Sequence, residues 1–475
     1  MRRVDLLKYA VLSPAILVGT ACTGRQEVKR PNIIYIFTDQ QSASMMSCAG
    51  NPWLKTPAMD YIAENGVRFT RAYAPNPVSA PARLCLITGR FPGYFRDTDG
   101  NPVRENGAAM RIQPLAEEVK HTTLASWMHR AGYELAYGGK QHLAPSLNPD
   151  TLGFNVISKD ERDDLAKRTA EYIKSQHAKP YFLIVSLINP HDICYMAIRD
   201  FAQTESDKGI IAHGKKEVAT LDEALKMPEH VSRKDFFTQY CPPLPPNFEP
   251  QEDEPQAVHW LINRRPFRRD ARINYTKEDW RMHRWAYCRL TELVDKQIQI
   301  ILNALKESGQ EENTLVIFSS DHGDMDASHR LEHKTVLYEE AINIPFLVMW
   351  KGTIPASVVD SVHLISNGLD LLPTVSDYAG FQGKADERGR SIRPLLECQP
   401  VEWRKSLGIE SQIGRAVIDA EHYKYVKYDV VDEEEQLLDH NKDPYETRHF
   451  TSVPEYAAKL VALREQYDEW FPSPQ

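Results

Sequence analysis

Three stretches of the chain are almost continuously apolar and then end abruptly in polar residues. They run from Asn32 to Phe37, from Tyr181 to Ile188 and from Thr314 to Phe318. Short apolar runs of this kind are typical of strands that are buried on both faces of a parallel sheet. In open α/β folds, ligands bind at the edge where the carboxyl ends of such strands meet. We therefore expect the polar residues that follow these strands to lie together.

Helical stretches separate these strands, which gives an alternating βαβα order. We predict helices from Thr56 to Gly66, from Thr123 to Gly132 and from Asp160 to about Gln176. The signals are cap residues, a Pro in the first turn and a Gly at the end. A longer helix is predicted to follow the cap at Thr276 and to run to about Ser308. The pattern predicts an α/β fold with a large mixed, mostly parallel sheet sandwiched by helices.

Two regions depart from this alternation. From Asp200 to Asn274 the periodicity fades, and four arginines gather at 264, 265, 268 and 269, so we expect an insertion near the site, either a solvated charged loop or a lid. Further on, residues 422–428 alternate like a half-exposed strand, residues 436–439 are the candidate partner strand, and residues 453–470 have a helical pattern. We expect a catalytic α/β domain over residues 23–390 and a small C-terminal subdomain, an antiparallel sheet plus a helix, over residues 391–475.

Composition fits a globular protein with one large domain and a smaller appendage. The chain has 475 residues, of which 42% are hydrophobic, enough for a sizeable core. The formal net charge is −9 and the basic residues are dispersed, so the footprint of a nucleic-acid binder is missing. An anionic ligand must therefore be bound by local basic residues.

The N-terminus has the pattern of a signal peptide. Arg2, Arg3 and Lys8 precede an apolar run from Tyr9 to Val18, which is too short to span a membrane. Cys22 follows the small residues 19–21 and looks like a bacterial lipoprotein cleavage site. We therefore expect residues 1–22 to be removed as a signal peptide of the lipoprotein type, with export to the periplasm or the outer membrane and a possible lipid anchor.

The most informative stretch runs from Asn76 to Arg90. Prolines at 75, 77 and 81 keep its first part extended, and the apolar residues 82–87 predict a short helix that Gly89 ends. Ser79 then stands at a helix N-terminus, where an oxyanion is favoured, and Arg83 adds a fixed charge one turn later. On chemistry alone, a Pro-rich turn before a buried helix explains the stretch equally well.

The order of residues in this stretch resembles the signature of type I sulfatases, a branch of the alkaline-phosphatase superfamily. The matching positions are Ser79-x-Pro81-x-Arg83 and Leu86-x-Thr88-Gly89-Arg90. The resemblance implies that Ser79 is oxidised to formylglycine (3-oxoalanine), whose hydrated aldehyde is the nucleophile. Because the residue is Ser and not Cys, it also implies maturation by the radical sulfatase-maturating enzyme of anaerobic bacteria.

Polar residues behind the first and third strands suit a divalent cation. Asp39 and Gln40 follow the first strand, and Asp321 and His322 follow the third. With the oxygen at position 79 they make a hard, mostly oxygen site, for which Ca²⁺ is the predicted ion and Mn²⁺ or Mg²⁺ the alternatives. Sulfatases usually carry two adjacent Asp at the first position and Asp-Asn at the second, so Gln40 and His322 depart from the family pattern.

The resemblance extends to the groups that would bind sulfate. Lys140 and His142 are similar to the family's GKxHL element, in which Lys binds sulfate and His contacts formylglycine. His191 resembles the family's sulfate-contacting His, and Lys334 its second sulfate-binding Lys. The C-terminal tract Asp443-Pro444-Tyr445-Glu446 is similar to the family's DPxE tail.

The function that this resemblance implies is hydrolysis of a sulfuric ester, with a sulfated saccharide as the expected substrate and Arg264 and Arg265 as candidate contacts to it. Either Asp321 or His142 is the base that allows sulfate to be expelled, and the sequence does not choose between them. Two alternatives remain open. One is a phosphonate or phosphate ester hydrolase of the same superfamily, and the other is a non-catalytic lipoprotein that binds sulfated glycans.

Overall fold

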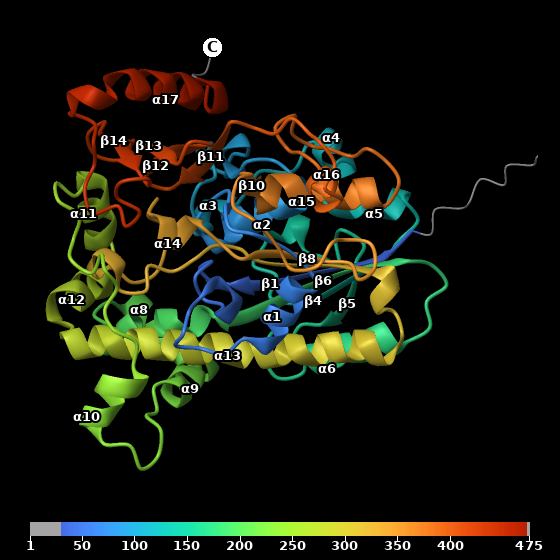
Figure 1. Cartoon of the computed structure of the whole chain (residues 1–475), viewed down its shortest axis with the longest axis horizontal. Coiled ribbons are helices and arrows are strands. Elements are labelled where there is room, and N and C mark those ends of the chain that lie inside the picture. Colours follow the sequence, from blue (N-terminus) through green and yellow to red (C-terminus); the bar gives the residue numbers. More distant parts are fainter. Residues whose placement is uncertain (1–29, 473–475) are drawn as a thin grey trace, which may run out of the picture.

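The centre of the molecule is an eight-stranded sheet with helices on both faces (Figure 1). The computed structural model describes residues 30–472, so the predicted signal peptide and Cys22 lie outside the described residues. Of the eight strands, only β8 runs against its neighbours, which confirms the predicted mixed, mostly parallel sheet. In spatial order the strands are β5 (Asn155–Ser158), β4 (Glu134–Gly139), β6 (Tyr181–Pro190), β1 (Asn32–Asp39), β7 (Thr314–Ser320), β8 (Phe346–Met349), β2 (Gly66–Phe69) and β9 (Val358–Asp360).

Two helical layers bury this sheet. On one face lie α1 (Pro57–Glu64), α6 (Leu165–Lys174) and α13 (Lys277–Glu307), packed against Ile34 and Ile36 of β1. On the other face lie α2 (Ser79–Thr88), α5 (Leu124–Arg130) and α15 (Asn367–Tyr378), packed against Ile33 and Tyr35. Successive strand residues point to opposite faces, so both layers are needed to bury the apolar run of β1. Shorter elements are β3 (Ala72–Tyr73), β10 (Ile365–Ser366), α3 (Asn106–Ala109), α4 (Glu117–His121), α14 (Glu339–Ile342) and α16 (Arg393–Leu396).

The helix starts show where local sequence signals hold. Thr276 and Asp279 form the predicted reciprocal capping box of α13. The Thr123 hydroxyl accepts a hydrogen bond from the Ser126 N–H and caps α5. These two predictions are confirmed.

One other predicted start is wrong, and the predicted start of α1 at Thr56 and Pro57 is right in position but lacks the side-chain cap. The carboxylate of Asp160 accepts the N–H groups of residues 162–164 in a turn, so α6 begins only at Leu165. The Thr56 hydroxyl accepts from the Ser47 N–H instead of capping α1. The carboxylate of Asp295, on α13, accepts the first free N–H groups of α1 in its place.

Residues 200–274 are largely helical, so a solvated charged loop does not describe this segment. The helices pack against one another and against one end of α13 (Figure 1). Their bounds are α7 (Tyr195–Asp200), α8 (Glu205–His213), α9 (Lys215–Ala224), α10 (Arg233–Asp235), α11 (Gln256–Asn263) and α12 (Pro266–Asn274).

The C-terminal region forms the predicted small antiparallel sheet with a covering helix (Figure 1). Its strands are β11 (Ser406–Ser411), β12 (Gly414–Asp419), β13 (Tyr423–Tyr428) and β14 (Glu435–Asp439), and α17 (Ala457–Trp470) packs on them. Apolar side chains of this sheet share a buried cluster with Leu337 and Ile342. The small sheet is thus packed against α14 and the loop before it, which follow β7 in the chain.

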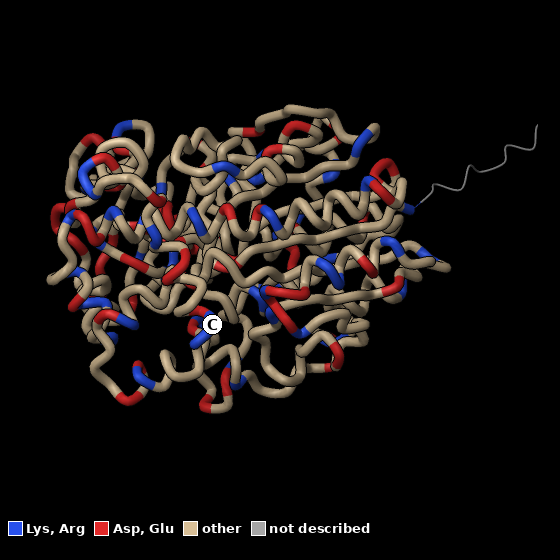
Figure 2. The backbone as a smooth tube through the Cα atoms, turned by 90° about the horizontal axis from the view of Figure 1, so that it is seen from below, with Lys and Arg blue, Asp and Glu red and all other residues tan. Residues whose placement is uncertain are grey.

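Acidic and basic residues are interspersed along the whole described chain (Figure 2). Within residues 30–472, none of the helices has the length and apolarity needed to cross a membrane.

Candidate active site

Asp39 and Asp321 lie side by side at the carboxyl ends of neighbouring strands. β1 and β7 are parallel, with Thr38 paired to Ser320, so the next residue of each strand falls at the same edge. Both carboxylates and the imidazole of His322 are fully buried. The predicted meeting of these polar residues is confirmed, and we refer to Asp39, Asp321 and His322 as the sheet-edge cluster.

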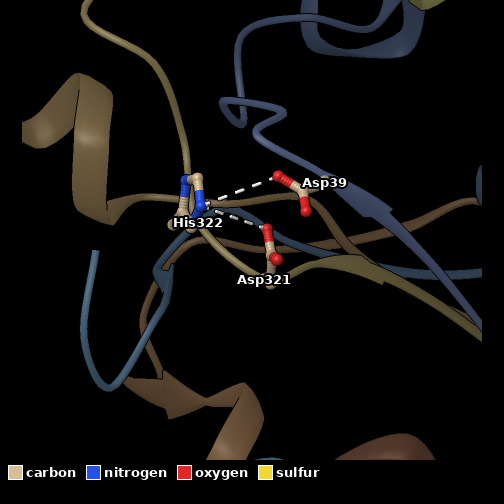
Figure 3. A group of neighbouring side chains, drawn as sticks. All are labelled: Asp39, Asp321 and His322. Atoms are coloured by element: carbon tan, nitrogen blue, oxygen red, sulfur yellow. Dashed lines mark ion pairs between the residues drawn. The ribbon is translucent and has the colours of Figure 1, made fainter. Parts of the chain in front are cut away.

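Arg83 of α2 holds one oxygen of each carboxylate. Its Nη2 donates to Oδ2 of Asp39 and its Nε to Oδ2 of Asp321, both at 3.0 Å. The two Oδ1 atoms lie 3.8 and 3.5 Å from Nε2 of His322 (Figure 3). Three possible ligand atoms therefore converge within 4.8 Å of one another, on the side away from the guanidinium.

The tautomer of His322 follows from its hydrogen bonds. Nδ1 donates to the carbonyl oxygen of Gly323 at 2.9 Å, and burial together with the charge of Lys334 holds the pKa of His322 well below its usual value. The ring is therefore neutral, and the lone pair of Nε2 faces two carboxylate oxygens. A cation among these atoms relieves their repulsion, and carboxylate oxygens with an imidazole nitrogen are suitable ligands for a divalent ion.

The two carboxylates differ in how they hold charge. Burial alone would raise the pKa of Asp39, but Lys140, Lys334 and Arg83 outweigh it and hold that pKa well below the usual range. Burial and the charge of Asp39 raise the pKa of Asp321 to about 6. Without a metal, Asp321 thus takes up a proton as the pH falls below about 6, and a metal ion would displace that proton.

Ser79 is the first residue of α2 and lies against the same ligand atoms. Its Oγ is 2.9 Å from Nε2 of His322 and 3.4 Å from Oδ1 of Asp39. The helix follows the extended residue Val78 and ends at Gly89, which has a left-handed φ of 65°. The predicted short helix is confirmed, and it places Ser79 at the positive end of the helix dipole.

The predicted lysines both approach Asp39. Lys140 Nζ lies 2.6 Å from Oδ2, and Lys334 Nζ lies 4.0 Å from Oδ1. Because both ammonium groups lie within 4.0 Å of Asp39, they can neutralise the oxygens of a sulfate that binds beside it.

The predicted histidines 142 and 191 lie in the field of the same charges. Each has a buried Nδ1 without a hydrogen-bond partner in the described part of the chain. Burial and the charge of Lys140 lower the pKa of His142 to about 3 and that of His191 well below its usual value. Neutral rings with a free nitrogen are suited to proton transfer once an anionic group enters.

Gln40 makes contacts that the sequence did not indicate. Its side-chain oxygen accepts from Lys334 Nζ at 2.6 Å and from the Cys194 thiol at 2.9 Å, and its side-chain nitrogen donates to Asp324 at 2.6 Å. Only its main-chain N–H reaches Asp321, at 3.1 Å. Coordination by Gln40 stays a prediction, and it would require the amide oxygen to release Lys334 or Cys194.

Asp324 and Cys194 were missed by sequence reasoning. Asp324 lies in the polar stretch behind β7, which was a usable signal, whereas nothing in the sequence pointed to Cys194.

The four clustered arginines have different surroundings. Arg264 and Arg265 are exposed, and among the described residues no hydrogen bond or ion pair joins them to the sheet-edge cluster. Arg269 pairs with Asp270 at 2.9 Å. Only Arg268 lines a cavity together with Lys334.

A second group with two carboxylates and a histidine lies at the junction of the two sheets. Nε2 of His440 is 2.8 Å from Oε1 of Glu446 and 4.0 Å from Oε1 of Glu339. The fully buried ammonium of Lys424, on β13, contacts Glu446, lies 3.4 Å from Glu339 and donates to the carbonyl oxygen of Leu337. We call Glu339, Lys424, His440 and Glu446 the junction cluster. In it, the ammonium of Lys424 occupies the position that a metal ion would take between the carboxylates.

The fold is that of hydrolases of the alkaline-phosphatase superfamily. The sulfatase family matches residues 31–381, most of the chain, and the C-terminal part of N-sulphoglucosamine sulphohydrolase matches residues 327–470. The chain therefore belongs to the sulfatase family and is a sulfuric ester hydrolase.

Similar proteins support this assignment along nearly the whole chain. A delta 4,5-hexuronate-2-O-sulfatase of Bacteroides thetaiotaomicron is 27% identical, over 95% of this chain and 92% of its own. An N-acetylglucosamine-6-O-sulfatase of the same species is 26% identical, over 98% and 90%. The solved structure of a 2-O GAG sulfatase has a TM-score of 0.75 at 26% identity, covering 93% of this chain and 92% of that one. A phosphonate monoester hydrolase of Agrobacterium radiobacter shares the fold, with a TM-score of 0.66 at 21% identity over 92% and 96%.

Proposed function

We propose that this sulfatase removes sulfate from a sulfated saccharide and that Ser79, after oxidation to formylglycine, is the residue that attacks sulfur. The observation that carries the proposal is the position of Ser79 at the start of α2, with Oγ 2.9 Å from His322 and 3.4 Å from Asp39. The names of the two similar Bacteroides enzymes favour a saccharide, and because one is a 2-O- and the other a 6-O-sulfatase, they leave the position of the sulfate open.

Each residue around the sulfate has a separate task. Lys140 and Lys334 bind the sulfate oxygens and stabilise charge in the transition state. His191 protonates the departing alcohol oxygen. Arg83 keeps both carboxylates in place through their Oδ2 atoms, because it donates to each at 3.0 Å. A hydrated aldehyde at position 79 supplies one hydroxyl for attack and a second for the release of sulfate.

His142 is the better supported base for that release. Both oxygens of Asp321 already accept hydrogen bonds, from Arg83 and from the Gln40 N–H. Nδ1 of His142 has no partner among the described residues, and the negative charge of a bound sulfate raises its pKa from about 3 towards neutrality.

We propose one divalent cation held by the sheet-edge cluster and the oxygen at position 79. It would lower the pKa of the hydrate and polarise a sulfate oxygen. Ca²⁺ is the predicted ion, and Mn²⁺ is the alternative that the imidazole of His322 favours over an all-oxygen set. Metal analysis of the purified enzyme, followed by reconstitution with each ion, distinguishes them.

Mass spectrometry of the peptide that contains residue 79 tests the nucleophile. Formylglycine lacks two hydrogen atoms of Ser, so protein made together with the anaerobic radical maturase should contain the lighter peptide and hydrolyse sulfate esters. Ser79→Ala should lose at least about a thousandfold in turnover, because the nucleophile supplies several kcal/mol. Ser79→Cys, made with an oxygen-dependent maturase, should regain activity. An unmodified peptide with full turnover would refute formylglycine, and an unmodified peptide with saccharide binding alone would favour the non-catalytic alternative.

A phosphonate or phosphate ester hydrolase remains the second candidate function, since the shared fold extends to such an enzyme. Comparison of aryl sulfate, aryl phosphate and aryl phosphonate as substrates tests it. The sulfatase proposal expects the largest kcat/KM for the sulfate, and a larger value for either phosphorus ester would favour the alternative.

We further propose that the protein is exported to the periplasm or the outer membrane and lipidated at Cys22. The support is the apolar run from Tyr9 to Val18 with the small residues before Cys22. Labelled palmitate should be incorporated into the wild type and not into Cys22→Ala, and equal labelling would contradict lipidation at this residue.

A further inference from the structure

We propose that Arg268 binds a second anionic group of the substrate, a carboxylate or a second sulfate, beside the sulfate that is removed. The inference rests on the proposed function and narrows its substrate class to acidic saccharides. Arg268 lies on α12, in the segment 200–274 that the sequence predicted to be an insertion near the site.

The guanidinium of Arg268 is largely removed from water and incompletely paired. Its side chain is 15% exposed, and its Nε is buried without a hydrogen-bond partner in the described part of the chain. The Oε1 atom of Glu332 lies 4.0 Å from Nε, which is beyond hydrogen-bond distance. Burial lowers the pKa of Arg268 to about 10, so the group still carries its charge at neutral pH. A hydrogen bond from an acceptor stabilises a buried, incompletely paired charge more than it stabilises a charge that water already solvates.

Arg268 lies close to Lys334, because the two side chains line one small cavity of about 10 Å³, room for about a single water molecule. Nζ of Lys334 lies 4.0 Å from Asp39 and 2.6 Å from the side-chain oxygen of Gln40. The pKa of His333, next in the chain to Lys334, is lowered by burial and by the charges of Arg268 and Lys334. An anion that contacts Arg268 would therefore bind close to the sulfate held by Lys334.

The chemistry of the guanidinium favours an anion over a neutral hydroxyl. The planar fork of an arginine donates two parallel hydrogen bonds to a carboxylate or sulfate edge, whereas a sugar hydroxyl accepts one. Glu332, whose side chain is 2% exposed and contacts the imidazole of His333, offsets the charge of Arg268 in the free protein.

The other three arginines of the cluster do not share these surroundings. The guanidinium of Arg264 lies over the ring of Trp260 at 4.6 Å, and Arg265 is exposed. Arg269 is 44% exposed and pairs with Asp270. Arg269 therefore provides a matched control on the same helix.

The test uses the matured, metal-loaded enzyme and three saccharides that carry the same scissile sulfate. One is otherwise neutral, one has a neighbouring uronate carboxylate, and one has a neighbouring second sulfate. Arg268→Gln should raise KM about 10- to 100-fold for the carboxylate or the disulfated saccharide, with kcat and the neutral substrate unchanged. Arg268→Lys should keep part of the preference, and Arg269→Gln should leave all three substrates within about twofold.

The pattern across substrates separates the possible outcomes. A larger effect on the carboxylate or on the second sulfate identifies which anion is recognised. An equal loss on all three substrates, or none on either acidic one, would overturn the proposal, and thermal unfolding of the variants checks that they fold. If the wild type cleaves none of the three, the proposed function fails. Calorimetric binding of the desulfated acidic saccharide to wild type and Arg268→Gln then still tests Arg268, because equal affinities would refute its role.

Discussion

The sheet-edge cluster and the junction cluster contain the same kinds of group but differ in where positive charge lies. At the junction, the Lys424 ammonium lies among the carboxylate oxygens and holds them together. At the sheet edge, Arg83 pairs with the outer oxygens and leaves the inner ones facing His322. Two carboxylates and a histidine are thus not enough to indicate a metal site. The position of the nearest protein cation decides whether the group is a closed ion network or a place for a ligand.

The largest expected effect separates the two clusters by metal content. Asp321→Asn removes a ligand charge but keeps the shape of the side chain, so we expect loss of bound metal and a fall in kcat of at least about a thousandfold. Glu446→Gln is the corresponding change at the junction, and this variant should keep the bound metal and the kcat of the wild type. Metal analysis and turnover of the two variants measure this, and equal metal loss in both would remove the distinction between the clusters.

The next effect separates the clusters by stability. Lys424→Met leaves the buried carboxylates of Glu446 and Glu339 without their cation, so the free energy of unfolding should fall by about 3–5 kcal/mol. Metal content and turnover of the folded protein should not change. Lys427→Met is the control, because this lysine lies on the same strand but is 38% exposed and pairs with Glu433, so its loss should cost under about 1 kcal/mol. Denaturant unfolding gives both values, and similar losses would show that Lys424 is not the centre of the junction.

The smallest effect is in pH dependence. Burial and Asp39 raise the pKa of Asp321 from 3.8 to about 6, so a proton competes with the metal below that pH. Metal affinity should fall about tenfold per unit as pH drops below about 6, which titrations at several pH values measure. An affinity that stays constant down to pH 4 would contradict the raised pKa.

The junction responds in a different pH window. Burial alone would raise the pKa of Glu446, but Lys424 and His440 lower it from 4.5 to about 2. The stability that this group contributes is therefore present above pH 4.5 and is lost only as the pH falls towards 2. The difference in stability between wild type and Glu446→Gln should be constant above pH 4.5 and should shrink as the pH falls from 4.5 to about 2, which acid unfolding of the two proteins measures.

Much of the sheet and of its functional edge followed from local sequence signals. The apolar runs of β1, β6 and β7 are buried on both faces, and the residue after such a run must lie at the sheet edge, so Asp39 and Asp321 could be paired in advance. The prolines and Gly89 similarly fixed the short helix that begins at Ser79.

Contacts made across the fold left no such signal. Gln40 has a left-handed φ of 70°, and its side chain meets Lys334 and Asp324, which no local pattern indicates. The alternation in β13 predicted a half-exposed strand, yet Lys424 is fully buried because Glu446 covers it from a later loop. In the arginine cluster, sequence drew attention to Arg264 and Arg265, which are exposed. Arg268 on α12 is largely buried and incompletely paired, and its burial depends on which side of the helix packs inward.

The burial of α2 has a consequence for the order of events during synthesis. Ser79 is 1% exposed, and every residue of its helix is buried between the sheet and α15. An enzyme that oxidises this serine has to reach its side chain, which the folded chain covers. If Ser79 is oxidised as proposed, the oxidation has to precede closure of the core, and a chain that folds first would stay inactive although correctly folded.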